Sequence, residues 1–182
     1  MYWNIQNYVC SCDICQRRLK GKRKEPFHPI QVGWAFERIG IDLVGPLPIT
    51  TQKNWYIIVA TDYLTRWSKA RAVPDARAET LAKFIFKEII CRYRISKIIF
   101  LDQKRNFISE TVRILCEKLF IKHKFSSPYH LQTNGMVERL NRILCNSLTK
   151  VKDKDKDWDI YIPAILFAYR IKKHVTTRYT PF

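Results

Sequence analysis

The sequence is poor in acidic residues: 16 aspartates and glutamates stand against 33 lysines and arginines, which gives a formal net charge of +17. A positive charge of this size indicates an anionic partner. No amphipathic basic helix marks a membrane anchor, so we favour nucleic acid over a membrane surface. The alternative is that the charge only keeps the protein in solution.

The sequence also lacks a signal peptide and any apolar run long enough to cross a bilayer. We therefore expect a soluble, intracellular protein with no membrane partner. Its six cysteines are not spaced like the disulfide framework of a secreted protein. We interpret Cys91, Cys116 and Cys145, which fall in apolar segments, as buried thiols.

Histidine is absent where a zinc site would need it. Cys12 and Cys15 form a C-x-x-C pair, which supplies two of the four ligands of tetrahedral zinc. Cys10 is a candidate third ligand, but no histidine precedes the pair and the nearest one after it is His28. We therefore expect an incomplete zinc site. The basic run that follows it is typical of a solvated linker and would add to the attraction for phosphates.

The periodicity of apolar residues predicts an α/β domain. With 182 residues and 47% apolar composition, the chain suits one full domain and a small appendage. Short apolar runs predict strands at 39–45, 55–63, 67–73, 97–101 and 121–125. A helical period predicts helices at 78–93, 108–120 and 158–171, with a further helix after Gly135. Three antiparallel strands followed by strands joined through helices predict a five-stranded mixed sheet with helices on both faces.

Residues 126–144 join a turn to that further helix. Pro128 breaks the preceding strand, and Gly135 is permissive at a point where the backbone passes close to something. Glu138 then lies in the first turns of the helix, at the rim of the core. The core-facing stripe beside it is Val137, Leu140, Leu144 and Leu148.

Two further carboxylates are candidates to join Glu138. Asp42 lies inside the strand at 39–45, and Asp102 ends the strand at 97–101. An aspartate in a buried strand is costly unless it is paired or binds a metal. Three carboxylates in one pocket would repel each other, and a divalent cation removes that conflict. Oxygen ligands favour Mg2+ or Mn2+, and two such ions about 4 Å apart can hold both oxygens of a phosphodiester exchange. The alternative for each acid alone is a surface or capping carboxylate.

The motifs around these acids resemble those of retroviral and gypsy-type LTR retrotransposon integrases, over nearly the whole chain. Asp102 and Glu138 have the spacing of the family's D,D-35-E signature. The carrying motifs are Cys12-Asp-Ile-Cys15-Gln16, Ile41-Asp42-Leu-Val-Gly-Pro46, Leu101-Asp102, Asn106-Phe107 and Pro128-Tyr-His-Leu-Gln-Thr-Asn-Gly135-Met-Val-Glu138-Arg-Leu-Asn141.

The resemblance implies a ribonuclease H-like fold, preceded by a short, partial zinc-binding helical segment. The expected division is a zinc-binding remnant at 1–24, a linker at 25–36, and a catalytic core at 37–182 that is truncated at its C-terminal end. The implied chemistry is 3′-end processing of element DNA by water, followed by attack of the new 3′-hydroxyl on target DNA.

The resemblance also implies roles for individual residues. Asp42, Asp102 and Glu138 would be the catalytic metal ligands. The residues expected to meet DNA are Tyr129, Asn134 and Gly135 in a loop at the scissile end, and Arg139, Asn141 and Arg142 one turn beyond it. For the two arginines, an ordinary solvated helix face is the alternative.

Two functions stay open at this point. The first is a metal-dependent polynucleotidyl transferase that acts on element DNA ends and target DNA. It would work in the nucleus as a homo-oligomer, and it would have no small-molecule substrate. The second is a catalytically decayed or domesticated integrase-derived DNA-binding protein, because Lys104 stands where the family usually has glycine. A ribonuclease H proper shares the fold and metals, but the segment from Pro128 to Gly135 favours an integrase.

Overall fold

The computed structural model describes residues 2–13, 32–102, 109–125, 131–152 and 157–182. The chain forms two compact units, Met1–Ile30 and Gln31–Phe182. In the first unit, helix α1 (Tyr2–Ser11) exposes Trp3 and Tyr8. The candidate carboxylates all lie in the second unit.

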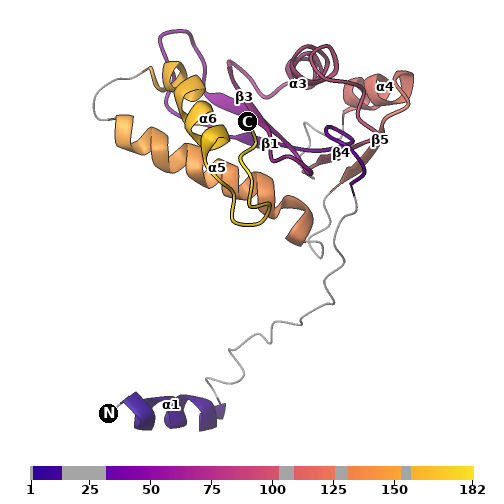
Figure 1. Cartoon of the computed structure of the whole chain (residues 1–182). Coiled ribbons are helices and arrows are strands. Elements are labelled where there is room, and N and C mark those ends of the chain that lie inside the picture. Colours follow the sequence, from indigo (N-terminus) through magenta and orange to yellow (C-terminus); the bar gives the residue numbers. More distant parts are fainter. Residues whose placement is uncertain (1, 14–31, 103–108, 126–130, 153–156) are drawn as a thin grey trace. The chain divides into compact units, whose positions relative to one another are not determined.

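The second unit is built on a five-stranded mixed sheet, as the sequence predicts (Figure 1). Its strands are β1 (Arg38–Val44), β2 (Tyr56–Asp62), β3 (Ser68–Val73), β4 (Ile98–Leu101) and β5 (Lys122–Phe125). The strand order is β3-β2-β1-β4-β5. The β1–β2 and β2–β3 pairs are antiparallel, whereas β1–β4 and β4–β5 are parallel.

Helices cover both faces of this sheet (Figure 1). On one face lie α3 (Ala78–Phe84), the π-helical turn η1 (Ile85–Ile90) and α4 (Glu110–Lys118). On the other lie α5 (Leu131–Lys152), the 3-10 turn η2 (Trp158–Tyr161) and α6 (Ile162–Ile171). No helix in the described ranges is both long and apolar enough to span a bilayer.

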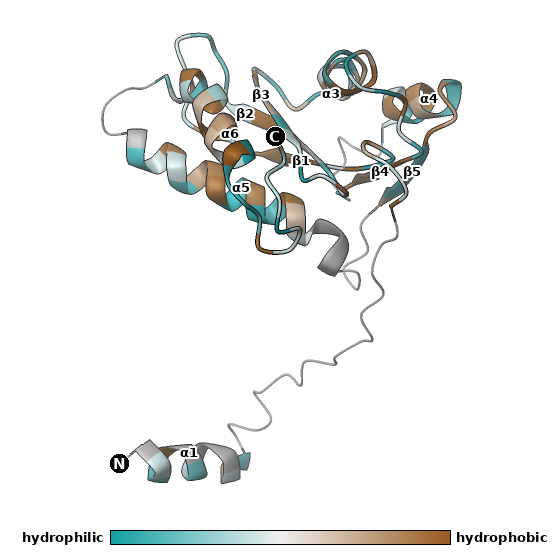
Figure 2. Ribbon diagram, in the orientation of Figure 1, coloured by the Kyte–Doolittle hydropathy of each residue, from teal (hydrophilic) through white to brown (hydrophobic). Residues whose placement is uncertain are grey.

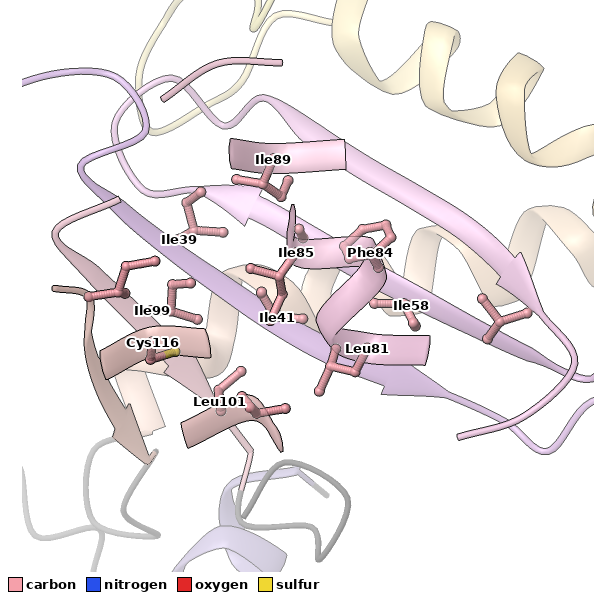
Figure 3. Packing of buried hydrophobic residues seen from close by; sticks show 14 residues of the cluster. Ile39, Ile41, Ile58, Leu81, Phe84, Ile85, Ile89, Ile99, Leu101 and Cys116 are labelled. Carbon is pink, nitrogen blue, oxygen red and sulfur yellow. The ribbon is translucent and has the colours of Figure 1, made fainter. Parts of the chain in front are cut away.

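The sheet separates two hydrophobic clusters. Alternate residues of β1, Ile39 and Ile41, pack with Ile99 and Leu101 against α3, η1 and α4, as Figure 3 shows. The other cluster joins the opposite sheet face to α5 and α6. Its α5 members are the predicted stripe of Val137, Leu140, Leu144 and Leu148, all buried. In Figure 2, α5 carries hydrophobic and hydrophilic residues in alternation along its length, as expected of a helix with one buried face.

The structure corrects three expectations about these elements. Helix α5 begins at Leu131, so Asn134 and Gly135 belong to the helix and not to a loop before it. A glycine costs a helix only about 1 kcal/mol relative to alanine, and the buried stripe on α5 offsets that cost. The helix predicted at 78–93 changes to π geometry at Ile85 and ends at Ile90. Cys116 is buried as expected and Cys145 partly so, but Cys91 follows the last turn of η1 and is exposed.

A candidate carboxylate site between the sheet and helix α5

Asp42 lies on the sheet face that α5 covers. Ile39 and Ile41 point to the other face, so the alternation of strand side chains turns Gly40 and Asp42 toward α5. Asp42 is partly buried and pairs across β1–β2 with Val59, a member of the α5 cluster. The strand at this point thus presents a carboxylate to the helix layer.

Both carboxylate oxygens of Asp42 accept hydrogen bonds. The backbone N–H of Leu43 donates to Oδ1 at 2.7 Å, and Asn141 Nδ2 donates to Oδ2 at 2.7 Å. These bonds fix the rotation of the Asp42 side chain.

Asp102 is brought beside Asp42 by the parallel pairing of β1 and β4. Ile41 and Leu101 are register partners, so Asp42 and Asp102 are the next residues on neighbouring chains. Adjacent strands lie about 4.8 Å apart, and the position after Leu101 belongs by alternation to the face of Asp42. Asp102 is partly buried. The register therefore places two carboxylates side by side.

Glu138 is carried on α5, which approaches β1 closely at Gly40. A Cβ built on Gly40 would lie 2.7 Å from Val137 Cγ2 and 3.1 Å from Tyr63 Cε2. The absence of a side chain at Gly40 therefore lets α5 pack directly on the strand. Glu138 follows Val137 and is exposed. It lies three residues before Asn141, so both residues are on the same side of the helix.

Asn141 is the residue whose contact the sequence did not reveal. We expected it to meet DNA, and the structure shows its amide nitrogen bound to Asp42. Its Oδ1 is buried and has no hydrogen-bond partner within the described part of the chain. The signal available in the sequence was spacing: a polar residue at i+3 from Glu138 has to lie on the same side of the helix.

The donor chemistry of this site fits a hard divalent cation. Asp42, Asp102 and Glu138 offer only carboxylate oxygens, and the unpartnered Asn141 Oδ1 could accept a hydrogen bond from a water of a hydrated ion. Within the described ranges, however, no three His, Cys, Asp or Glu side chains are already arranged to hold a metal ion. The register places Asp42 and Asp102 on one sheet face, but the three acids do not form a closed set of ligands.

The other predicted contacts fall in different places. Arg139 and Arg142 are exposed on α5, and Gly135 is partly exposed within it. Tyr129 and Lys104 lie outside the described residues, as does Cys15. Cys12, its C-x-x-C partner, follows α1 directly and is partly exposed.

The comparison with protein families gives one match that covers more than half of the chain. Residues 35–130 match the integrase core domain. This match spans β1 to β5, and it includes Asp42 and Asp102. Integrase core domains have the ribonuclease H-like fold, so the expected fold is confirmed. As a family they are polynucleotidyl transferases that use divalent metal ions.

Individual relatives are similar along most of the chain. The Pol polyprotein of Drosophila melanogaster transposon 412 is 30% identical over 149 residues, which cover 81% of this chain and 12% of the relative. Bovine gypsy retrotransposon integrase-like protein 1 is 27% identical over 188 residues, covering 100% of the chain and 37% of the relative. The Gag-Pol polyprotein of feline leukemia virus is 32% identical over 117 residues, which cover 63% of this chain and 7% of the relative. The chain thus spans well under half the length of these relatives, and it belongs to the integrase core domain family of retroviruses and LTR retrotransposons.

Proposed function

We propose that this chain is the core of a retrotransposon integrase, a polynucleotidyl transferase for 3′-end processing and DNA strand transfer. The observation that carries the proposal is the hydrogen bond from Asn141 to Asp42. It joins the helix of Glu138 to the strand of Asp42, and Asp102 directly follows the neighbouring strand β4. This link supports the proposal that the three acids act together.

Asp42, Asp102 and Glu138 would hold Mg2+ or Mn2+. When bound, such ions supply Lewis-acid stabilisation of the attacking and leaving oxygens of a phosphodiester. Asn141 holds the Asp42 carboxylate in one rotation and is therefore a positioning residue. The exposed Arg139 and Arg142 would contact DNA phosphates, for which the guanidinium fork is well suited. Tyr129, Asn134 and Gly135 complete the proposed DNA-contacting set.

The partners and the domain organisation are also part of this proposal. The substrates would be element DNA ends and target DNA, and the protein would act as a homo-oligomer in the nucleus. Residues 1–24 would be a zinc-binding segment with Cys12 and Cys15 as ligands. Residues 25–36 would be the linker, and 37–182 the catalytic core.

A disintegration assay on branched DNA, with Mg2+ or Mn2+, tests the proposed chemistry. We expect strand joining by the unchanged chain and loss of detectable product in Glu138→Gln, because the substitution removes one anionic ligand while it keeps the side chain's shape. Glu79→Gln is the matched control, since Glu79 is an exposed glutamate of α3 on the opposite sheet face.

Equal product from the two glutamine variants would contradict the role of Glu138. If the unchanged chain gave no product with either metal while still binding DNA, the transferase proposal would be wrong, and the decayed or domesticated DNA-binding protein would be the remaining function.

A further inference from the structure

Three cationic residues and a histidine gather beside helix α5. We call them the Arg66 cluster: Arg66 in the β2–β3 turn, Arg139 on α5, and Lys172 and His174 after α6. Two tyrosines, Tyr63 and Tyr169, lie among them and interact with Arg66. The cluster thus joins three parts of the chain that are far apart in sequence.

Arg66 is the least balanced member of this cluster. Its Nε and Nη1 are buried, and neither has a hydrogen-bond partner in the residues that the structure describes. Its backbone is in the left-handed region, with φ of 67°. Burial lowers the pKa of Arg66 most, Tyr169, Tyr63 and Asp62 act in the opposite direction, and Arg139 lowers it further. Two N–H groups of the guanidinium are thus buried without a described acceptor, which is unfavourable.

The acid near Arg66 is already engaged elsewhere. Asp62 accepts hydrogen bonds from the backbone N–H of Phe36 at 2.9 Å and from the N–H and hydroxyl of Thr65 at 2.9 and 2.7 Å. Burial also raises the pKa of Tyr63 and of Tyr169, so both phenols stay neutral. Asp62 favours the charged form of Arg66, but its described hydrogen bonds go to other groups.

His174 is partly exposed and lies near the same cations. Its ring meets Tyr169 edge-on, with centroids 4.7 Å apart at 80°. Burial lowers the pKa of His174 most, and the charges of Arg66, Arg139 and Lys172 lower it further, against a hydrogen bond with the Tyr169 backbone. Several cations therefore act on one partly exposed position.

An oxyanion has the properties that this cluster lacks. It brings negative charge and only acceptor atoms, so it can offset the repulsion among the cations and take the two unpartnered N–H groups of Arg66. Arg66 and His174 are partly exposed and Arg139 is exposed, so the cluster reaches the protein surface. Arg139 directly follows Glu138 in the sequence, so α5 carries both a member of the cluster and a candidate metal ligand.

We propose that the Arg66 cluster binds a backbone phosphate of DNA. The proposal rests on the proposed function, because it takes DNA as the substrate. It assigns Arg66 and His174 to DNA binding, together with Arg139.

The first test measures the affinity of the full chain for a DNA oligonucleotide at several salt concentrations, without metal. We expect Arg66→Gln to weaken binding about tenfold at low salt and to reduce the slope of log affinity against log salt by about one. Arg66→Lys should keep the slope and lose part of the affinity, because it keeps the charge but not the fork. Arg77→Gln is the matched control, since Arg77 is an exposed arginine before α3 on the other sheet face.

The second test uses the unchanged chain and therefore does not depend on how a variant folds. The pKa of His174 is measured by NMR in three samples: the free chain, the chain with the oligonucleotide, and the chain with inorganic phosphate. The last two contain the same total concentration of phosphate groups. We expect the oligonucleotide to raise the pKa of His174 toward its ordinary value, because a bound phosphate offsets the charges of Arg66 and Arg139, and inorganic phosphate to raise it much less.

The outcomes separate this proposal from the proposed function. The phosphate site would be overturned if Arg66→Gln and Arg77→Gln gave the same slope of log affinity against log salt. It would also be overturned if DNA left the pKa of His174 unchanged. Either result would stand even if the chain joins DNA strands. An equal shift with inorganic phosphate would assign the cluster to a free anion and overturn the DNA proposal. Loss of DNA binding in Arg66→Gln would support the site even if the disintegration assay fails, because neither binding test requires catalysis.

Discussion

At the scale of single residues, Asn141 links the two halves of the carboxylate site. Its amide donates to Asp42 from a helix turn that also carries Glu138, so one side chain sets the relation between β1 and α5. Replacing a residue that orients a metal ligand in this way typically lowers metal affinity or activity by about 10–100-fold. The residue that holds a candidate ligand in place therefore helps to locate the site, as the ligand itself does.

We predict that Asn141→Ala lowers strand joining by about 10–100-fold and changes DNA affinity little, because Asp42 loses its orientation while the exposed arginines remain. The measurement is the disintegration rate together with the DNA dissociation constant. Asn146→Ala, at an exposed position of the same helix, is the control and should behave like the unchanged chain. A purely DNA-contacting Asn141 would instead lose affinity and activity together.

At the scale of elements, the site depends on how closely α5 lies on β1. The two glycines near it have opposite surroundings. A Cβ at Gly40 would meet Val137 Cγ2 at 2.7 Å, whereas a Cβ at Gly135 would have nothing within 4 Å. Gly40 is thus required by packing, and Gly135 is not required by the helix that contains it.

We predict that Gly40→Ala lowers the free energy of unfolding by about 1–3 kcal/mol, because the new methyl forces α5 and Tyr63 to shift. Gly135→Ala should raise it by about 1 kcal/mol, because alanine is the better helix former. Denaturant unfolding of both variants measures these changes. A neutral Gly40→Ala would show that α5 can move away from β1 at no cost.

At the scale of the whole molecule, the net charge of +17 dominates the expected interactions. Arg139 and Arg142 are exposed on α5, and backbone phosphates are the partner that this positive charge fits. Binding driven by phosphates depends on salt and discriminates little among sequences.

We predict that affinity for duplex DNA of unrelated sequences is similar, and that it falls by about 10³-fold or more between 50 and 200 mM salt if six or more phosphates are contacted. Fluorescence anisotropy over that range measures it, with the chain's affinity for an uncharged peptide nucleic acid duplex as the control. An affinity that does not change with salt would contradict an electrostatic partner.

The sequence by itself determined the sheet, the helices and the membership of the core. Alternation in β1 and the one-turn spacing of Val137, Leu140, Leu144 and Leu148 depend only on local geometry, so the structure reproduces them. The two aspartates could be proposed because each interrupts or ends a strand otherwise fit for burial. The start of α5 was predicted too late, because Pro128 and Gly135 are typical of a loop, whereas the helix begins at Leu131 and includes Gly135.

Only the tertiary structure decided which residues meet across elements. The register of β1 and β4 places Asp102 beside Asp42, and close packing at Gly40 brings Asn141 to Asp42. The gathering of Arg66, Arg139, Lys172 and His174 around Tyr169 has no local signal at all, because three separate segments supply it. Local patterns record which face a residue takes, whereas contacts between distant segments depend on how the layers pack.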